Sequence, residues 1–151
     1  MTVGVAQRWL RRFSSPPAPR LRLACFAHAG GSASFFRTWP RSLPADVEVL
    51  AIRYPGRQDR LAEPCAQRLD DLVDDVAAAL AEPLADGVPF AFFGHSMGSA
   101  IAFETARRLE ARWGLRAGGG GVIGPPRPPP RRKRARHTEL RAAVWAAVCE
   151  V

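Results

Sequence analysis

A serine flanked by two glycines lies in the segment Gly94-His95-Ser96-Met97-Gly98. The apolar run 90–93 precedes it and has the length and aromatic content of a buried strand. A helix-like pattern begins directly after the serine. A Gly-x-Ser-x-Gly segment between a strand and a helix is typical of the sharp turn that presents a nucleophilic serine. The sequence therefore predicts Ser96 as a catalytic nucleophile, and an ordinary glycine-rich loop is the alternative.

The chemistry of such a turn explains the spacing of its residues. The turn is too sharp for side chains two residues before and two residues after the serine, so glycines stand there. The serine hydroxyl then lies at a helix N-terminus, where free N–H groups and the helix dipole stabilise developing negative charge. The N–H of Met97, the residue after the serine, is one predicted donor to an oxyanion.

A second donor is expected in the loop that follows an early strand, which here reads His28-Ala29-Gly30-Gly31. Small residues let a backbone approach a substrate carbonyl closely. We assign this donor to the N–H of Ala29 and expect His28, Gly30 and Gly31 to contact substrate. A tight turn without a catalytic role is the alternative.

The segments that must position these residues alternate between strand and helix patterns. Strands are predicted at 21–26, 47–54 and 90–93, and a helical turn at 34–39. Amphipathic helices are predicted at 68–82 and from Ser96 to about Arg112. Their apolar faces are formed by Leu69, Leu72, Val73, Val76 and Leu80, and by Ile101, Thr105, Leu109 and Trp113. This order predicts an α/β fold with a parallel sheet.

The ends of the chain differ from this central domain, predicted at 21–117. Residues 1–20 carry Trp9, Leu10 and Phe13 among arginines, followed by a proline-rich linker. We favour a partly ordered arm over packing of these apolar residues on the domain. Residues 118–151 contain four consecutive glycines, five prolines at 125–130 and an arginine-rich run, so a disordered tail is expected.

The net charge of +8 resides at the two ends of the chain, because the central domain carries a charge of −1. The basic run at 127–136 has no interleaved aromatic residues, so no specific nucleic-acid partner is predicted. No apolar run has the length of a membrane span, and the N-terminus has no secretory signal. Three widely separated cysteines fit neither a disulfide framework nor a zinc site, which predicts a cytoplasmic protein.

The chain resembles the type II thioesterases, the external editing enzymes of polyketide and non-ribosomal peptide synthesis. The matching segments end near residue 117 and read WLRRF at 9–13, CFAHAGGSA at 25–33, RYPGR at 53–57 and FGHSMG at 93–98. The resemblance implies a partial α/β-hydrolase fold. It implies as substrate an acyl or aminoacyl thioester on the phosphopantetheine arm of an acyl or peptidyl carrier protein, with no cofactor. Ser96 would attack the thioester, and the N–H groups of Ala29 and Met97 would hold the oxyanion.

The sequence departs from this family after the serine. The acid and base of such enzymes follow the nucleophile in the order Asp or Glu, then His. No aspartate follows Ser96, the one later histidine is His137, and Glu139 comes after it. His137 is a weak candidate base, because a solvated tail histidine is the more ordinary interpretation. We therefore expect little or no turnover, and a truncation or a reading-frame shift near residue 117 is one hypothesis.

Two other functions remain open at this point. The first is a catalytically inactive module that binds a carrier protein and shields its arm. The second is nucleic-acid binding through residues 127–136, with non-specific polyelectrolyte attraction as its simpler explanation.

Overall fold

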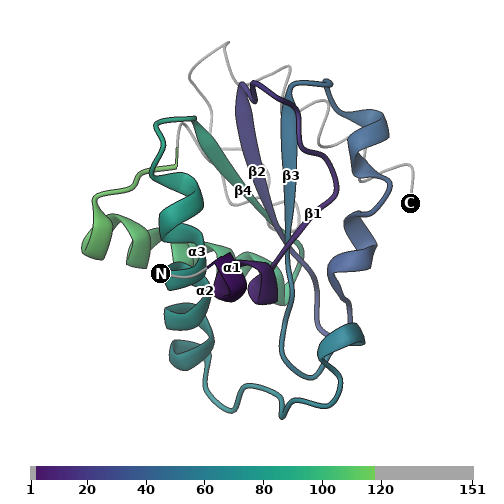
Figure 1. Cartoon of the computed structure of the whole chain (residues 1–151). Helices are drawn as coiled ribbons and strands as arrows, with labels where there is room; N and C mark the ends of the chain where they lie inside the picture. Colours follow the sequence, from purple (N-terminus) through teal and green to yellow (C-terminus); the bar gives the residue numbers. More distant parts are fainter. Residues whose placement is uncertain (1–2, 118–151) are drawn as a thin grey trace, which may run out of the picture.

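Residues 3–117 are described by the computed structural model (Figure 1). The predicted tail at 118–151, with His137 and Cys149, lies outside the described residues. The division of the chain at residue 117 therefore stays a prediction.

A four-stranded sheet forms the centre of the described part. Its strands are β1 (Leu10–Arg12), β2 (Leu21–Phe26), β3 (Val47–Ile52) and β4 (Phe90–Gly94), in the spatial order β1-β3-β2-β4. Strand β2 pairs in parallel with both β3 and β4, whereas β1 is antiparallel to β3. All six residues of β3 are buried, as a central strand requires. The strand order agrees with the partial α/β-hydrolase fold that the resemblance implies, but the sheet is mixed where a parallel sheet was expected.

Helices cover both faces of this sheet (Figure 1). The α-helices are α1 (Val3–Trp9), α2 (Leu69–Leu84) and α3 (Met97–Trp113), and the 3-10 helices are η1 (Ala33–Phe36), η2 (Trp39–Ser42) and η3 (Gln58–Arg60). Helix α2 packs between α1 and α3, and α3 contacts β2 and β4. The helices η1 and η2 contact β3. This arrangement encloses one hydrophobic core.

The predicted helix faces are confirmed except at their ends. In α2, Val73, Val76 and Leu80 are fully buried, whereas Leu69 in the first turn is 48 % exposed. In α3, Ile101, Thr105 and Leu109 are buried, but Trp113 in the last turn is 42 % exposed. Periodicity predicts which residues share a helix face, but a terminal turn reaches the core only where the fold provides a neighbour.

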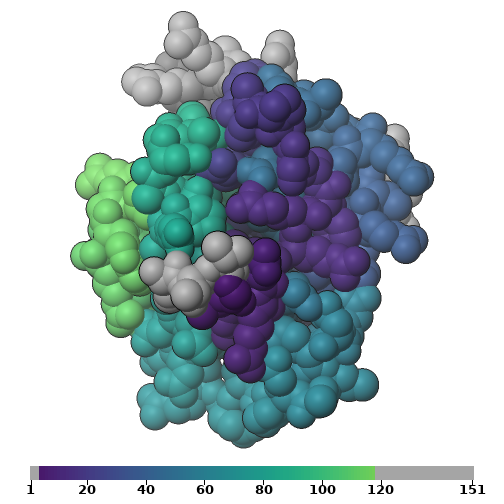
Figure 2. All heavy atoms as spheres, in the orientation of Figure 1, coloured from purple at the N-terminus to yellow at the C-terminus, as the bar shows by residue number. Residues whose placement is uncertain are grey.

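The expectation of a partly ordered arm is wrong for residues 3–13. Leu10 lies opposite Ile52 in the β1–β3 ladder, and the N–H of Arg53 donates to the Trp9 carbonyl at 2.7 Å. Trp9 and Leu10 are both buried in the core. In Figure 2 the purple N-terminal residues lie across the centre of the visible face, between the teal and blue parts of the chain. Burial of these apolar side chains outweighs the entropy lost when the segment becomes ordered.

Candidate active site

Two loops meet at the carboxyl ends of β2 and β4. These strands are adjacent and parallel, with Phe26 opposite Gly94 in the register. The N–H of His95 also donates to the Phe26 carbonyl at 3.2 Å. The small-residue loop after β2 and the serine turn after β4 therefore leave the same edge of the sheet side by side.

Ser96 occupies a strained backbone conformation at the start of α3. Its φ of 53° and ψ of −117° lie outside the regions that residues with a side chain normally adopt. Only Gln58 shares a positive φ among the non-glycine residues of the described part. The Ser96 carbonyl accepts the N–H of Ser99 at 2.9 Å and the Ser99 hydroxyl at 2.5 Å, which holds the turn closed. The Ser96 side chain itself is exposed and has no hydrogen-bond partner within residues 3–117.

The two flanking glycines have no room for a side chain. A Cβ atom on Gly94 would stand 2.4 Å from the Gly98 carbonyl oxygen. A Cβ atom on Gly98 would stand 2.1 Å from the Phe26 carbonyl oxygen and 2.6 Å from that of Ala27. Each distance is far below van der Waals contact. The turn thus packs directly against the backbone of β2, which explains the glycine spacing seen in the sequence.

A buried tyrosine anchors the loop after β2. Tyr54 follows β3 and donates its hydroxyl to the Ala27 carbonyl at 3.1 Å. Burial raises the pKa of the Tyr54 phenol, so the group stays a neutral donor. The N–H groups of Ala29 and Met97 take no part in the turn and cap hydrogen bonds of the described residues. They are therefore free to act as donors to a ligand.

Aromatic rings gather beside the serine turn. The His28 ring packs edge-on against Phe35 and His95, with centroids 5.3 and 5.2 Å apart. A Cβ atom on Gly31 would meet the His28 ring at 2.8 Å, so the loop glycine makes room for this imidazole. The Nδ1 atom of His28 is buried and has no partner within the described residues. Ala29 and Gly30, next in the loop, are exposed.

The structure thus brings Ser96, Met97 and the loop of residues 28–31 to one edge of the sheet. It does not bring His137 there, because this residue lies outside the described part. The sequence did not predict that Phe35 packs against His28 or that Tyr54 donates to the Ala27 carbonyl. The position of Tyr54 could have indicated a role near the site, because it follows a strand and lies within one of the segments that resemble type II thioesterases.

Neither a metal centre nor a membrane span is found between residues 3 and 117. No group of three His, Cys, Asp or Glu side chains in this part could hold a metal ion. None of its helices combines the length and the apolar character that crossing a bilayer requires.

The comparisons with known proteins show the family to which the chain belongs. The family model described as "Thioesterase domain" matches residues 21–149. The chain belongs to the thioesterase family. The family match extends past residue 117, where the motifs recognised in the sequence end.

Three thioesterases illustrate the similarity. Thioesterase PikA5 of Streptomyces venezuelae is 50 % identical over 111 residues, which are 74 % of this chain and 39 % of PikA5. The type II thioesterase BorB of the borrelidin cluster superposes with a TM-score of 0.61 at 42 % identity, covering 68 % of this chain and 41 % of BorB. RedJ of the prodiginine pathway in Streptomyces coelicolor gives a TM-score of 0.62 at 40 % identity, covering 69 % and 38 %. The chain thus spans less than half the length of these thioesterases.

Proposed function

We propose that this protein is a thioesterase that acts on acyl or aminoacyl thioesters carried by the phosphopantetheine arm of an acyl or peptidyl carrier protein. The observation that carries the proposal is the strained turn at Ser96, closed between two glycines that have no room for a side chain. The similarity to BorB, a type II thioesterase of the borrelidin biosynthetic cluster, and to RedJ of the prodiginine biosynthetic pathway supports the substrate class.

The proposed reaction begins with attack of the Ser96 hydroxyl oxygen on the thioester carbonyl carbon. The hydroxyl proton passes to a general base, and the carbonyl oxygen becomes an oxyanion held by the N–H groups of Ala29 and Met97. The carbon–sulfur bond then breaks, and the pantetheine thiol leaves with the proton. Water hydrolyses the acyl-serine ester and releases the carboxylic acid. The pantetheine arm is a part of the substrate, so the reaction needs no cofactor.

The reaction needs a general base, which in this family is a histidine that follows the serine in the sequence. Residues 97–117 contain no histidine. His28 and His95 lie next to the turn, but they belong to the loop and to the elbow itself. His137 remains the candidate base from the sequence, outside the described residues. Removing one member of a catalytic triad commonly lowers kcat by several orders of magnitude. We expect correspondingly slow turnover unless a base reaches Ser96.

A fluorophosphonate probe tests whether Ser96 is an activated nucleophile. The full chain, Ser96→Ala and the control Ser15→Ala would be labelled in parallel, with circular dichroism to check folding. If a base reaches Ser96, we expect labelling of the wild type and of Ser15→Ala, and none of Ser96→Ala. A folded wild-type chain without labelling would contradict the hydrolase proposal.

Carrier-protein binding separates the enzyme from the inactive module. A purified carrier protein with and without its acylated arm would be titrated into the chain, while release of free acid is followed. Acid release that requires Ser96 supports the thioesterase. Binding of the loaded carrier without acid release favours a shielding module.

A further inference from the structure

Gln58 has a strained backbone outside the serine turn. Its φ of 44° lies in the left-handed region, which a residue with a side chain adopts at a cost in free energy. The other non-glycine residue of the described part with a positive φ is Ser96, where the strain belongs to the serine turn. Gln58 lies in η3, after β3, so its strain needs a different explanation. Such strain persists only where the surrounding contacts hold it.

The side chain of Gln58 reaches the helix that follows the proposed oxyanion loop. Its Nε2 atom donates a hydrogen bond to the Ser34 hydroxyl, across 24 positions of the chain. Ser34 lies in the first turn of η1. Ser32, the N-cap residue of η1, makes no side-chain hydrogen bond to this helix. The Gln58 amide thus holds the start of η1 from outside the helix.

Tyr54 holds the other end of the same loop. Its hydroxyl donates to the carbonyl of Ala27, the residue that follows β2. Residues 54–58, which we call the clamp segment, therefore contact the chain on both sides of residues 28–32. One contact comes from the first residue of the segment and the other from its last.

The middle of the loop has little support of its own. Ala29 and Gly30 are exposed. Among the described residues, the hydrogen bond inside the loop runs from the N–H of Gly31 to the His28 carbonyl, at 3.0 Å. A loop with few contacts opens more readily than the elements around it. The position of the Ala29 N–H therefore depends on the two ends of the loop.

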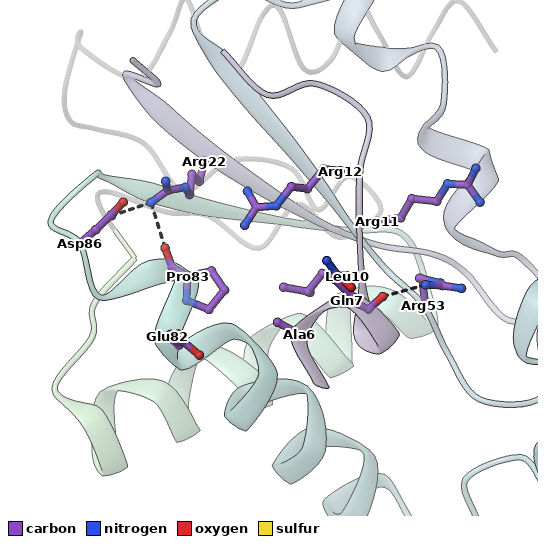
Figure 3. A pocket seen from close by; sticks show the side chains of 10 residues that line it. All are labelled: Ala6, Gln7, Leu10, Arg11, Arg12, Arg22, Arg53, Glu82, Pro83 and Asp86. Carbon is purple, nitrogen blue, oxygen red and sulfur yellow. Dashed lines mark hydrogen bonds and ion pairs between the residues drawn. The ribbon is translucent and has the colours of Figure 1, made fainter. Parts of the chain in front are cut away.

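The clamp segment is attached to a firm base. Arg53, directly before it, donates to the Asp59 carboxylate and, at 2.7 Å, to the Gln7 carbonyl of α1 (Figure 3). The Arg53 carbonyl accepts a hydrogen bond from the buried Arg60 at 2.7 Å. These contacts hold the chain on both sides of Gln58. The segment can therefore maintain the strain at Gln58 and fix the loop.

The core limits what the Gln58 contact can do. Phe36 of η1 and Trp39 of η2 are buried, and the Phe36 ring packs edge-on against Phe93 of β4 with centroids 6.0 Å apart. These apolar contacts hold η1 on the sheet without help from Gln58. Loss of the Gln58 amide should therefore leave η1 packed and loosen only its first turn and the loop before it.

We propose that Gln58 is a positioning residue of the serine site, whose side-chain amide fixes one end of the loop that carries the Ala29 N–H while Tyr54 fixes the other. The inference rests on the function proposed above, because it gives this N–H the role of an oxyanion donor. Gln58 acts through the loop and not on the substrate. An oxyanion donor stabilises the transition state only when it is held at the right position beforehand.

Two truncations separate the side chain of Gln58 from its backbone strain. Gln58→Ala removes the amide and keeps the strain, whereas Gln58→Gly removes the amide and relieves the strain. The first readout is amide hydrogen exchange of Gly31 and Phe35 by NMR on the full chain, because both N–H groups donate within this region, at 3.0 and 3.1 Å. We expect exchange about fivefold faster in both variants, the factor that corresponds to one lost hydrogen bond.

Stability and reactivity provide the other two readouts. In urea unfolding, Gln58→Gly should be at least as stable as Gln58→Ala, because glycine adopts a positive φ without strain. Labelling of Ser96 by a fluorophosphonate should nevertheless slow about fivefold in both variants. A residue that only stabilised the fold would not slow labelling in the variant that relieves strain.

Two further variants serve as controls. Gln7→Ala truncates another exposed glutamine and keeps the backbone carbonyl that Arg53 contacts, so it should match the wild type. Gln58→Glu should restore wild-type exchange, because the Ser34 hydroxyl can donate to a carboxylate.

The outcomes distinguish this inference from the function on which it rests. Faster exchange in both truncations of a chain that does not label would support the clamp and contradict the hydrolase proposal. Labelling of the wild type, with unchanged exchange and unchanged labelling in both truncations, would overturn the inference and leave the hydrolase proposal intact. Wild-type exchange in Gln58→Gly would also overturn it, because the loop would then be held without the amide.

Discussion

Gly98 of α3 lies so close to the end of β2 that a Cβ atom on it would stand 2.1 Å from the Phe26 carbonyl oxygen. The contact joins α3, the helix that begins after Ser96, to β2, the strand that precedes the loop of residues 27–32. The atom that the methyl group would meet belongs to the backbone of Phe26, so no side chain can move aside. The position of Ser96 relative to this loop therefore depends on the absence of one methyl group.

We expect Gly98→Ala to destabilise the protein by about 3 kcal/mol or more, because the helix must move away from β2 to admit the methyl group. Urea unfolding followed by circular dichroism measures the loss. Gly4→Ala in α1 is the control, since a Cβ atom there meets nothing within 4 Å. In a helix, alanine replaces glycine with a gain of up to about 1 kcal/mol. Equal stability of the two variants would show that the contact between α3 and β2 is not rigid.

Tyr54→Phe removes the hydrogen bond to the Ala27 carbonyl and keeps the buried ring. We expect a loss of about 1 kcal/mol in the free energy of unfolding, the usual contribution of such a bond. Because Ala27 begins the loop that carries Ala29, labelling of Ser96 by a fluorophosphonate should also slow. A variant with unchanged stability and unchanged labelling rate would mean that the tyrosine does not hold the loop.

Glu63 gives the protein a defined acid sensitivity. Hydrogen bonds from Arg60 and Arg8 lower the pKa of its carboxyl group to about 2, from an ordinary value of 4.5. A lowered folded-state pKa stabilises the folded state fully above pH 4.5, and this contribution is lost as the pH falls toward 2. Arg60 is itself buried and stacks on the ring of Trp9, so the contact also supports the N-terminal segment.

We expect Glu63→Gln to lose less stability than the wild type between about pH 5 and about pH 3. Urea unfolding at the two pH values measures the difference. Glu82→Gln serves as the control, because the Glu82 side chain is exposed and makes no hydrogen bond or ion pair within residues 3–117. The same pH dependence in Glu63→Gln and the wild type would contradict the assignment.

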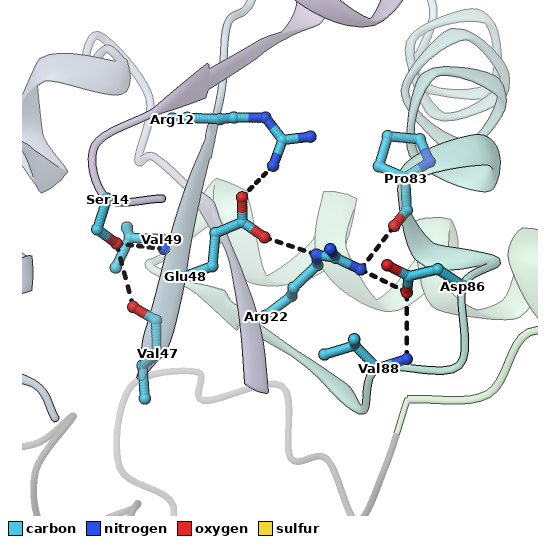
Figure 4. A network of polar contacts seen from close by, with 9 residues as sticks. All are labelled: Arg12, Ser14, Arg22, Val47, Glu48, Val49, Pro83, Asp86 and Val88. Atoms are coloured by element: carbon cyan, nitrogen blue, oxygen red, sulfur yellow. Dashed lines mark hydrogen bonds and ion pairs between the residues drawn. The ribbon is translucent and has the colours of Figure 1, made fainter. Parts of the chain in front are cut away.

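Glu48 is a buried carboxylate near the start of the central strand β3. It is 4 % exposed, and it accepts hydrogen bonds from Arg12 and, at 2.6 Å, from Arg22 (Figure 4). We expect Glu48→Gln to cost about 3 kcal/mol, because it removes the buried carboxylate that Arg12 and Arg22 share and leaves Arg22 only its ion pair with the more exposed Asp86. The exposed pair of Arg20 and Asp46 gives the comparison, and Asp46→Asn should cost less than about 1 kcal/mol. Similar losses in both variants would show that burial of Glu48 carries no special energetic weight.

The strand, turn and helix around Ser96 could be predicted from the sequence because the signals are local. The aromatic run of β4, the glycines on either side of the turn and the four-residue spacing in α3 all lie within 24 consecutive residues. The edge strand β1 could not be predicted in this way. It has three residues, too few for a periodic pattern, and it becomes a strand only by pairing with β3.

The sequence by itself determined the local geometry at Ser96, since only glycine permits the close backbone contacts that this turn makes. The tertiary structure decided which distant residues meet it. Tyr54 reaches the Ala27 carbonyl across 27 positions, and Arg12 and Arg22 meet on Glu48 from two different strands. Such contacts depend on strand order and register, which are set by packing of the whole core and leave no periodic trace in the sequence.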